Sequence, residues 1–205
     1  MKFEDISEKL RDKRLFIFDF DETIVNLNVK WEELKKELQA LVLERFNLEI
    51  TFTPILEKLE FLKSKITVQE FAPILEHLKH GEISALKHYS TKQPVGFALL
   101  GAIQKKFLQT SSNQKFIALL SNNYTDTITL GAKQYGIDSY ISYYVGRDMV
   151  KNIKPDVEGI RKIHDHFPSV QKSEIVYFGD SARYDKELAQ NYGIDFFLIS
   201  HPNEE

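Results

Sequence analysis

Two acidic residues directly follow a short apolar run near the start of the chain. Residues 15–18 read LFIF, and Asp19 and Asp21 come next within Asp-Phe-Asp-Glu-Thr. Ligands of open α/β sheets bind at the carboxyl ends of the strands, so both carboxylates would lie where chemistry usually occurs. Because neighbouring carboxylates repel each other, such a site favours a cation, and oxygen ligands suit Mg²⁺ better than softer metals. By itself this short motif is equally compatible with an acidic loop exposed to solvent.

Later apolar runs are also followed by groups that could bind phosphate or a metal ion. Each group has a simpler structural interpretation, because Ser121 or Asp180 could cap a helix and Lys154 could be a solvated surface residue. Their order along the chain favours the functional interpretation, since all of them fall at a strand end or a helix start. The segments are Ser121-Asn122-Asn123 after 116–120, Lys154-Pro155-Asp156 after 140–145, and Gly179-Asp180 after 174–178, with Asp185 five residues further on.

The apolar runs themselves predict a parallel sheet. They are short, nearly continuous, and rich in aromatic and β-branched residues, which is typical of strands buried on both faces. Helical patterns separate them: one spans 124–136, one begins with Pro155 at its first position, and one spans 182–192 and is closed by Gly193. This alternation predicts a doubly wound α/β fold of about five strands. The predicted strands are 15–18, 116–120, 140–145, 174–178 and 195–199.

Residues 28–90 have a different pattern, with helical spacing and no strand signal. Apolar residues recur at helical spacing from Trp31, a second helix is predicted to start at Thr53-Pro54, and Thr67 with Glu70 forms a capping-box pattern for a third. Gly81 is the predicted end of this third helix. We therefore predict a Rossmann-like core domain (1–27 and 91–205) with an inserted all-helical cap domain (28–90), joined by linkers at 25–29 and 89–96.

Composition excludes several classes of function. The net charge of −3 gives no basic surface for nucleic acid or an anionic membrane, so neither is an expected partner. The chain has no cysteine, which excludes thiolate metal sites and a cysteine nucleophile. The N-terminal segment is too charged for a signal-peptide core, and no apolar run approaches the roughly 20 residues that span a bilayer. We expect a cytoplasmic, soluble protein.

The full set of motifs resembles the haloacid dehalogenase (HAD) superfamily. Asp19-x-Asp21-x-Thr23, Ser121, Lys154 and Gly179-Asp180 with Asp185 match that superfamily in order and spacing over roughly residues 14–200. The inserted helical segment resembles the cap of phosphoglycolate-phosphatase-type members. Two small departures are the Glu at position 22, where many members have Gly, and the five-residue spacing between the last two aspartates.

The resemblance implies a role for each residue of the set. Asp19 would be the nucleophile that becomes phosphorylated, and Asp21 would be the general acid and then the general base. Mg²⁺ would be held by the Asp19 and Asp180 carboxylates and the backbone carbonyl of Asp21. The Ser121 hydroxyl, the Lys154 ammonium and the Asn122 backbone N–H would bind phosphate. Thr23 would brace the loop. Asp185 would either hold the metal through water or orient Lys154.

The implied function is that of a Mg²⁺-dependent phosphomonoester hydrolase acting on a small phosphorylated metabolite. The acid at Asp21 disfavours carbon–halogen hydrolysis, because the dehalogenases of the superfamily lack an acid there. One alternative is a phosphotransferase or mutase that moves phosphate between sugar hydroxyls. Another is a non-catalytic binding protein with the same fold, although such a protein would be expected to have lost Asp19 or Asp21.

Overall fold

The computed structural model describes residues 6–108 and 114–200, and the chain forms two compact units. One unit consists of residues 1–27 and 91–205 and is called the core unit; the other consists of residues 28–90 and is called the helical unit. Within the described residues, no helix is both long and apolar enough to cross a membrane.

A five-stranded parallel sheet forms the centre of the core unit. The strand order is β5-β4-β1-β6-β7, and every neighbouring pair is parallel, which confirms the predicted α/β fold. Because all strands run the same way, their carboxyl ends lie along one edge of the sheet. The strands are β1 (Leu15–Phe18), β4 (Phe116–Leu120), β5 (Tyr143–Val145), β6 (Ile175–Gly179) and β7 (Asp195–Leu198).

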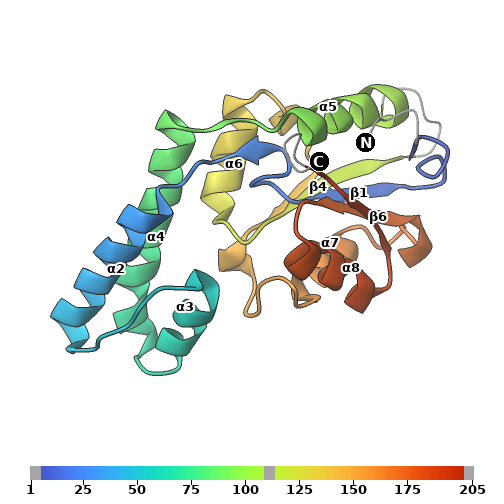
Figure 1. The fold of residues 1–205 in the computed structure, drawn as a ribbon. Coiled ribbons are helices and arrows are strands. Elements are labelled where there is room, and N and C mark those ends of the chain that lie inside the picture. The colour runs from blue at the N-terminus through green and yellow to red at the C-terminus, as the bar shows by residue number, and fades with distance from the viewer. Residues whose placement is uncertain (1–5, 109–113, 201–205) are drawn as a thin grey trace. The chain divides into compact units, whose positions relative to one another are not determined.

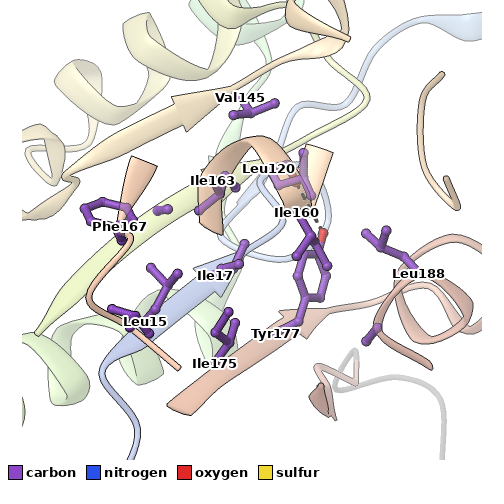
Figure 2. Close-up of a cluster of buried hydrophobic side chains, with 13 residues drawn as sticks. Leu15, Ile17, Leu120, Val145, Ile160, Ile163, Phe167, Ile175, Tyr177 and Leu188 are labelled. Atoms are coloured by element: carbon purple, nitrogen blue, oxygen red, sulfur yellow. Dashed lines mark hydrogen bonds between the residues drawn. The ribbon is translucent and has the colours of Figure 1, made fainter. Parts of the chain in front are cut away.

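Helices cover both faces of this sheet (Figure 1), which explains why its central strands are apolar at every position. Successive side chains alternate between the faces. On one face, Leu15, Ile17 and Tyr177 pack with residues of α7 (Glu158–His166) and α8 (Glu187–Tyr192), as Figure 2 shows. On the other face, Phe16 stacks on Phe107 at a ring-centroid distance of 5.7 Å, and Phe18 stacks on Phe178 at 4.5 Å.

Two predicted boundaries in the core unit were wrong. Strand β5 begins at Tyr143 and not at residue 140, because α6 (Thr125–Gln134) is followed by the left-handed Gly136 and then by a 3-10 turn over Asp138–Tyr140. Helix α7 begins at Glu158 and not at Pro155: residues 154–157 form a turn, in which the Asp156 carboxylate accepts a hydrogen bond from the Glu158 N–H at 2.8 Å. The prediction that Gly193 closes the helix of residues 182–192 is confirmed, with a φ of 76° at Gly193.

Sequence patterns did not indicate the elements next to the predicted linkers. Strands β2 (Val25–Asn26) and β3 (Thr91–Lys92) form a short antiparallel ribbon. Helix α5 (Pro94–Ile103) follows and continues into a π-helical turn, η1 (Gln104–Leu108). The Gln93 side chain caps α5 by accepting a hydrogen bond from the Gly96 N–H at 2.7 Å. At Gly96 a Cβ would overlap the backbone carbonyl of Thr23, so this helix start is packed directly against the loop that follows β1.

Three helices form the helical unit: α2 (Trp31–Phe46), α3 (Ile55–Lys63) and α4 (Val68–His88). The predicted capping box is present, because the Thr67 and Glu70 side chains each bond the backbone N–H of the other residue. The prediction that Gly81 ends this helix was wrong. Gly81 lies inside α4, where a Cβ would come within 2.8 Å of Leu34 Cδ2, so the glycine permits α2 and α4 to pack closely.

Candidate active site

The carboxyl ends of β1, β4 and β6 bring Asp19, Ser121 and Asp180 to one edge of the sheet. Asp19 follows β1 and still pairs with the sheet, because its N–H donates to the Phe178 carbonyl. Asp19 and Ser121 are buried, whereas Asp180 is partly exposed. Strand β1 therefore holds Asp19, the candidate nucleophile, by a hydrogen bond of the sheet and not in a free loop.

Lys154 joins this edge from the loop after β5. Its ammonium lies 2.8 Å from Asp19 Oδ1 and 2.7 Å from Asp185 Oδ1, and all three residues are at most 7% exposed. A solvated surface lysine is thereby excluded. The Asp185 carboxylate also accepts hydrogen bonds from the Ser181 N–H and the Tyr177 hydroxyl, at 3.1 Å each. Both oxygens of Asp185 are thus already bonded within the protein.

The charges of this cluster shift one another's pKa values. Burial raises the pKa of the Asp19 carboxyl well above its ordinary value; the Lys154 ammonium opposes this shift, and the Asp185 and Asp180 charges add to it. Burial lowers the pKa of Lys154, but the neighbouring carboxylates of Asp185 and Asp19 outweigh burial and raise it. Burial and the charge of Asp185 likewise raise the pKa of Asp180. Negative charge is therefore in excess at this edge, and an added cation would relieve it.

Three carboxylates in this cluster fit a divalent metal ion. One oxygen each of Asp19, Asp180 and Asp185 lie within 4.8 Å of one another. An all-oxygen set of this kind is typical of Mg²⁺ and of little use to softer metals. Asp180 is further oriented by the Thr23 hydroxyl, which donates to its Oδ1 at 3.1 Å. The residues present therefore fit the magnesium ion that the sequence predicts.

The loop after β4 is held in place by its own side chains. The Ser121 hydroxyl donates to Asn123 Oδ1 at 2.9 Å and accepts from the Asn123 N–H, so Ser121 orders this loop instead of capping α6. Asn122 Oδ1 accepts from the Lys154 N–H at 3.0 Å, which connects the loop to the lysine. Arg147 holds the same loop from outside, with its Nε donating to the Asn122 carbonyl at 2.6 Å.

Asp21 lies at the turn between β1 and the β2–β3 ribbon. Its Oδ1 accepts from the backbone N–H groups of Glu22 at 3.1 Å and Leu27 at 2.8 Å. Glu22 has a φ of 60°, a left-handed conformation that favours glycine, which is the residue many superfamily members have there. The Asp21 carboxylate is thus held by two backbone N–H groups that follow it in the chain.

Comparison with known proteins identifies the family. The model of the haloacid dehalogenase-like hydrolase family matches residues 16–199. The chain belongs to this family. The match spans almost the whole HAD-like chain and confirms the prediction of a HAD-type enzyme.

Individual relatives agree with this assignment. Pyrophosphatase PpaX from Listeria innocua is 27% identical over 180 residues, covering 85% of this chain and 77% of PpaX. A predicted phosphoglycolate phosphatase from Haemophilus somnus has a TM-score of 0.64 at 18% identity, covering 93% of this chain and 86% of its own.

Two further solved structures share the fold of this HAD-family chain. The candidate HAD hydrolase YfnB from Bacillus subtilis, solved with bound magnesium, has a TM-score of 0.61 at 16% identity, covering 94% of this chain and 91% of its own. A candidate β-phosphoglucomutase from Thermotoga maritima has a TM-score of 0.60 at 17% identity, with coverages of 94% and 88%.

Sequence reasoning gave no role to two residues that contact the predicted set, Tyr177 and Asn123, and did not indicate the partner of a third, Arg147. Tyr177 was interpreted only as part of an apolar strand, although a buried phenol needs a partner for its hydroxyl. Asn123 followed a recognised serine but was given no role of its own. Arg147 belongs to a loop whose sequence has no periodic pattern, so only the tertiary structure places it against Asn122.

Proposed function

We propose that this HAD-family enzyme is a Mg²⁺-dependent phosphomonoester hydrolase that acts on a small phosphorylated metabolite through a phosphorylated Asp19. The observation that carries the proposal is the Lys154 ammonium 2.8 Å from Asp19 Oδ1, within a cluster that also contains the Asp180 and Asp185 carboxylates. Phosphoryl transfer needs a positioned nucleophile and neutralisation of the phosphoryl oxygens, and this cluster offers both.

In the first step, an Asp19 carboxylate oxygen attacks phosphorus and the bond from phosphorus to the leaving oxygen breaks. Asp21 gives its proton to that oxygen, so the alcohol leaves as a neutral group. In the second step, Asp21 takes a proton from water as the water oxygen attacks phosphorus. The bond from Asp19 to phosphorus then breaks, and inorganic phosphate and the free carboxylate are regenerated.

The remaining residues would bind and orient the phosphoryl group. Lys154 and the Asn122 backbone N–H would donate to its oxygens. The Ser121 hydroxyl would do the same by turning its one hydrogen from Asn123 Oδ1 to the phosphoryl group. Asp19 and Asp180 would hold the magnesium ion, with the Asp21 carbonyl as a further ligand, and Thr23 would orient Asp180. A bound Mg²⁺ ion supplies positive charge that neutralises the phosphoryl oxygens.

Asp185 is better suited to orienting Lys154 than to holding the metal. Its Oδ1 already bonds Lys154 and Tyr177, and its Oδ2 accepts from the Ser181 N–H. Three of the roughly four acceptor positions of this carboxylate are therefore already occupied by groups of the protein. We therefore assign Asp185 the supporting role and leave the direct carboxylate ligands as Asp19 and Asp180.

The experiment that tests this function is phosphate release over a metabolite panel with Mg²⁺. The panel includes pyrophosphate and phosphoglycolate, which the names of the relatives suggest, together with sugar phosphates. We expect at least one substrate to be turned over, and we expect Asp19→Asn to lose all turnover while keeping its circular dichroism spectrum. Turnover by folded Asp19→Asn at the wild-type rate would exclude Asp19 as the nucleophile.

A phosphomutase is the second candidate, since the T. maritima structure of similar fold carries that name. The two activities share every step up to the phosphorylated aspartate and differ only in the acceptor. Incubation with a phosphorylated sugar and a second sugar distinguishes them: a hydrolase releases inorganic phosphate, whereas a mutase moves the phosphoryl group to a new hydroxyl without releasing it.

A further inference from the structure

Tyr177 places a polar group inside the apolar core of the core unit. The residue lies in β6 and is completely buried, and its ring packs among Ile160, Ile17 and Leu188 (Figure 2). A buried hydroxyl costs free energy unless it is hydrogen-bonded, and phenylalanine would fill the same space without that requirement. The hydroxyl of Tyr177 therefore calls for an explanation beyond packing.

The Tyr177 hydroxyl contacts three segments of the proposed phosphate site. It lies 3.3 Å from Lys154 Nζ, 3.1 Å from Asp185 Oδ1, and 3.3 Å from the carbonyl of Leu120, the residue before Ser121. A phenol has one hydrogen to donate, and the charged carboxylate is the nearer and stronger acceptor. The hydroxyl thus accepts from the Lys154 ammonium while it donates to Asp185.

The Lys154 ammonium has three hydrogens and lies close to three oxygen atoms: it donates hydrogen bonds to Asp185 and Tyr177, and it forms an ion pair with Asp19. The partners are Asp19 Oδ1 at 2.8 Å, Asp185 Oδ1 at 2.7 Å and the Tyr177 hydroxyl at 3.3 Å. Asp19 is the only one of the three whose carboxylate is consumed in the proposed reaction, because it becomes an acyl phosphate. Asp185 and Tyr177 use two of the ammonium hydrogens and fix the ammonium from the protein side. The third hydrogen, on the side of the Asp19 ion pair, is the one available to a phosphoryl oxygen.

We propose that the Tyr177 hydroxyl is a positioning group that aims the Lys154 ammonium at the phosphoryl group; this inference rests on the proposed function. A lysine ends in a freely rotating ammonium on a four-carbon chain, so its direction must be imposed by its partners. A hydrogen bond to Asp185 alone would fix one hydrogen of the ammonium and leave the ammonium free to rotate about that hydrogen bond. The second contact, to Tyr177, removes this freedom and leaves the third hydrogen in one direction.

The test compares two Tyr→Phe variants of the full chain. Tyr177→Phe removes the hydroxyl that contacts Lys154, and Tyr192→Phe is the matched control, because it removes a hydroxyl bonded at 2.7 Å to His164 in the same unit. With the best substrate from the panel, we expect Tyr177→Phe to lower kcat by roughly 10–100-fold, as loss of a supporting partner typically does. KM is expected to change little, because the ammonium charge remains; Tyr192→Phe is expected to keep wild-type kcat.

A second measurement follows the ammonium directly and needs no turnover. In ¹⁵N-lysine NMR, the Lys154 signal, assigned by its loss in Lys154→Arg, is expected to exchange slowly with water in wild type and in Tyr192→Phe. Exchange at least about tenfold faster in Tyr177→Phe supports the proposal, since a less constrained ammonium exposes its hydrogens more often.

Failure of this inference is distinguishable from failure of the proposed function. If wild type hydrolyses phosphate esters but Tyr177→Phe matches Tyr192→Phe in kcat, the positioning role is overturned and the phosphatase stands. If wild type hydrolyses nothing on the panel, the function fails, and the NMR comparison still decides whether Tyr177 holds the ammonium. Equal exchange rates in the two Phe variants overturn the proposal in either case.

Discussion

Gly179 and Asp185 are in such close contact that a Cβ at residue 179 would overlap the Asp185 carboxyl group. Gly179 is the last residue of β6 and directly precedes Asp180. Asp185 is fully buried and bonded to Lys154. The absence of a side chain at residue 179 therefore sets where the buried carboxylate lies, and through it the position of the lysine.

We expect Gly179→Ala to impair catalysis more than folding. The added methyl group must displace Asp185, which misplaces Lys154, and misplacement by about 1 Å can cost roughly 100-fold in rate. Overpacking of this size costs about 1–3 kcal/mol of unfolding free energy. Phosphate release and urea unfolding measure the two effects.

The matched control for this variant is Gly101→Ala, which lies in α5 with no atom within 4 Å of the added Cβ. Alanine is the better helix former, so the unfolding free energy of this variant is expected to rise by about 0.5–1 kcal/mol, and its phosphate release is expected to stay at the wild-type rate. Full activity in both variants would show that the position of Asp185 does not matter for the reaction.

Removal of the metal is expected to abolish activity reversibly. A chelator should stop phosphate release, and added Mg²⁺ should restore it, because the ion supplies positive charge to the gathered carboxylates of Asp19, Asp180 and Asp185. Asp180→Asn removes a proposed ligand charge and is expected to raise the Mg²⁺ concentration for half-maximal activity by roughly 10–100-fold. An unchanged Mg²⁺ requirement in this variant would remove Asp180 from the ligand set. Asp195→Asn, at an exposed carboxylate on β7, is the control.

Substitutions of the buried ion pair Lys154 and Asp185 are expected to have strongly non-additive effects on the unfolding free energy. Lys154→Met leaves two buried carboxylates without their cation, and loss of one member of a buried pair costs about 3–5 kcal/mol. The double variant Lys154→Met/Asp185→Asn leaves less unpaired charge, so its loss of unfolding free energy should be smaller than the sum of the single losses. Denaturant unfolding of the four proteins in the cycle measures this; simple additivity would contradict it.

The capping box of α4 is expected to weaken in acid. Hydrogen bonds from the Thr67 backbone N–H and hydroxyl lower the pKa of Glu70. A lowered pKa means that the carboxylate stabilises the folded state above its unfolded pKa, near 4.5, and that this contribution is lost as the pH falls through the lower folded value. The stability difference between wild type and Glu70→Gln should therefore be present at pH 7 and should shrink progressively below about pH 4.5.

Thermal unfolding at a series of pH values measures this difference. Glu76→Gln, at an exposed position on the same helix, is the control and should not reproduce the trend. A gap between wild type and Glu70→Gln that stays constant from pH 7 into the acid range would show that the charge of Glu70 contributes nothing to the cap.

Short stretches of sequence were sufficient to predict those elements whose determining residues are close together in the chain. The strand at 15–18 has a continuous apolar run, and the capping box at Thr67 has both of its partners within four residues. Gly81 shows the limit of this reasoning. Its residue type predicts a helix end, but its close contact with Leu34 on another helix decides that α4 continues to His88. The β2–β3 ribbon was missed because its two-residue strands are too short for any periodic signal.

The sequence alone predicted the motif residues of the candidate site, because motif order and strand ends can be read along the chain. Only the tertiary structure decided how they are bonded: that Lys154 lies between Asp19 and Asp185, and that Tyr177 and Asn122 support it. The physical reason is that these partners lie from 23 residues (Tyr177) to more than 100 residues (Asp19) from Lys154 in the chain. Their contacts depend on the parallel register of β1, β4 and β6, which no short stretch of sequence encodes.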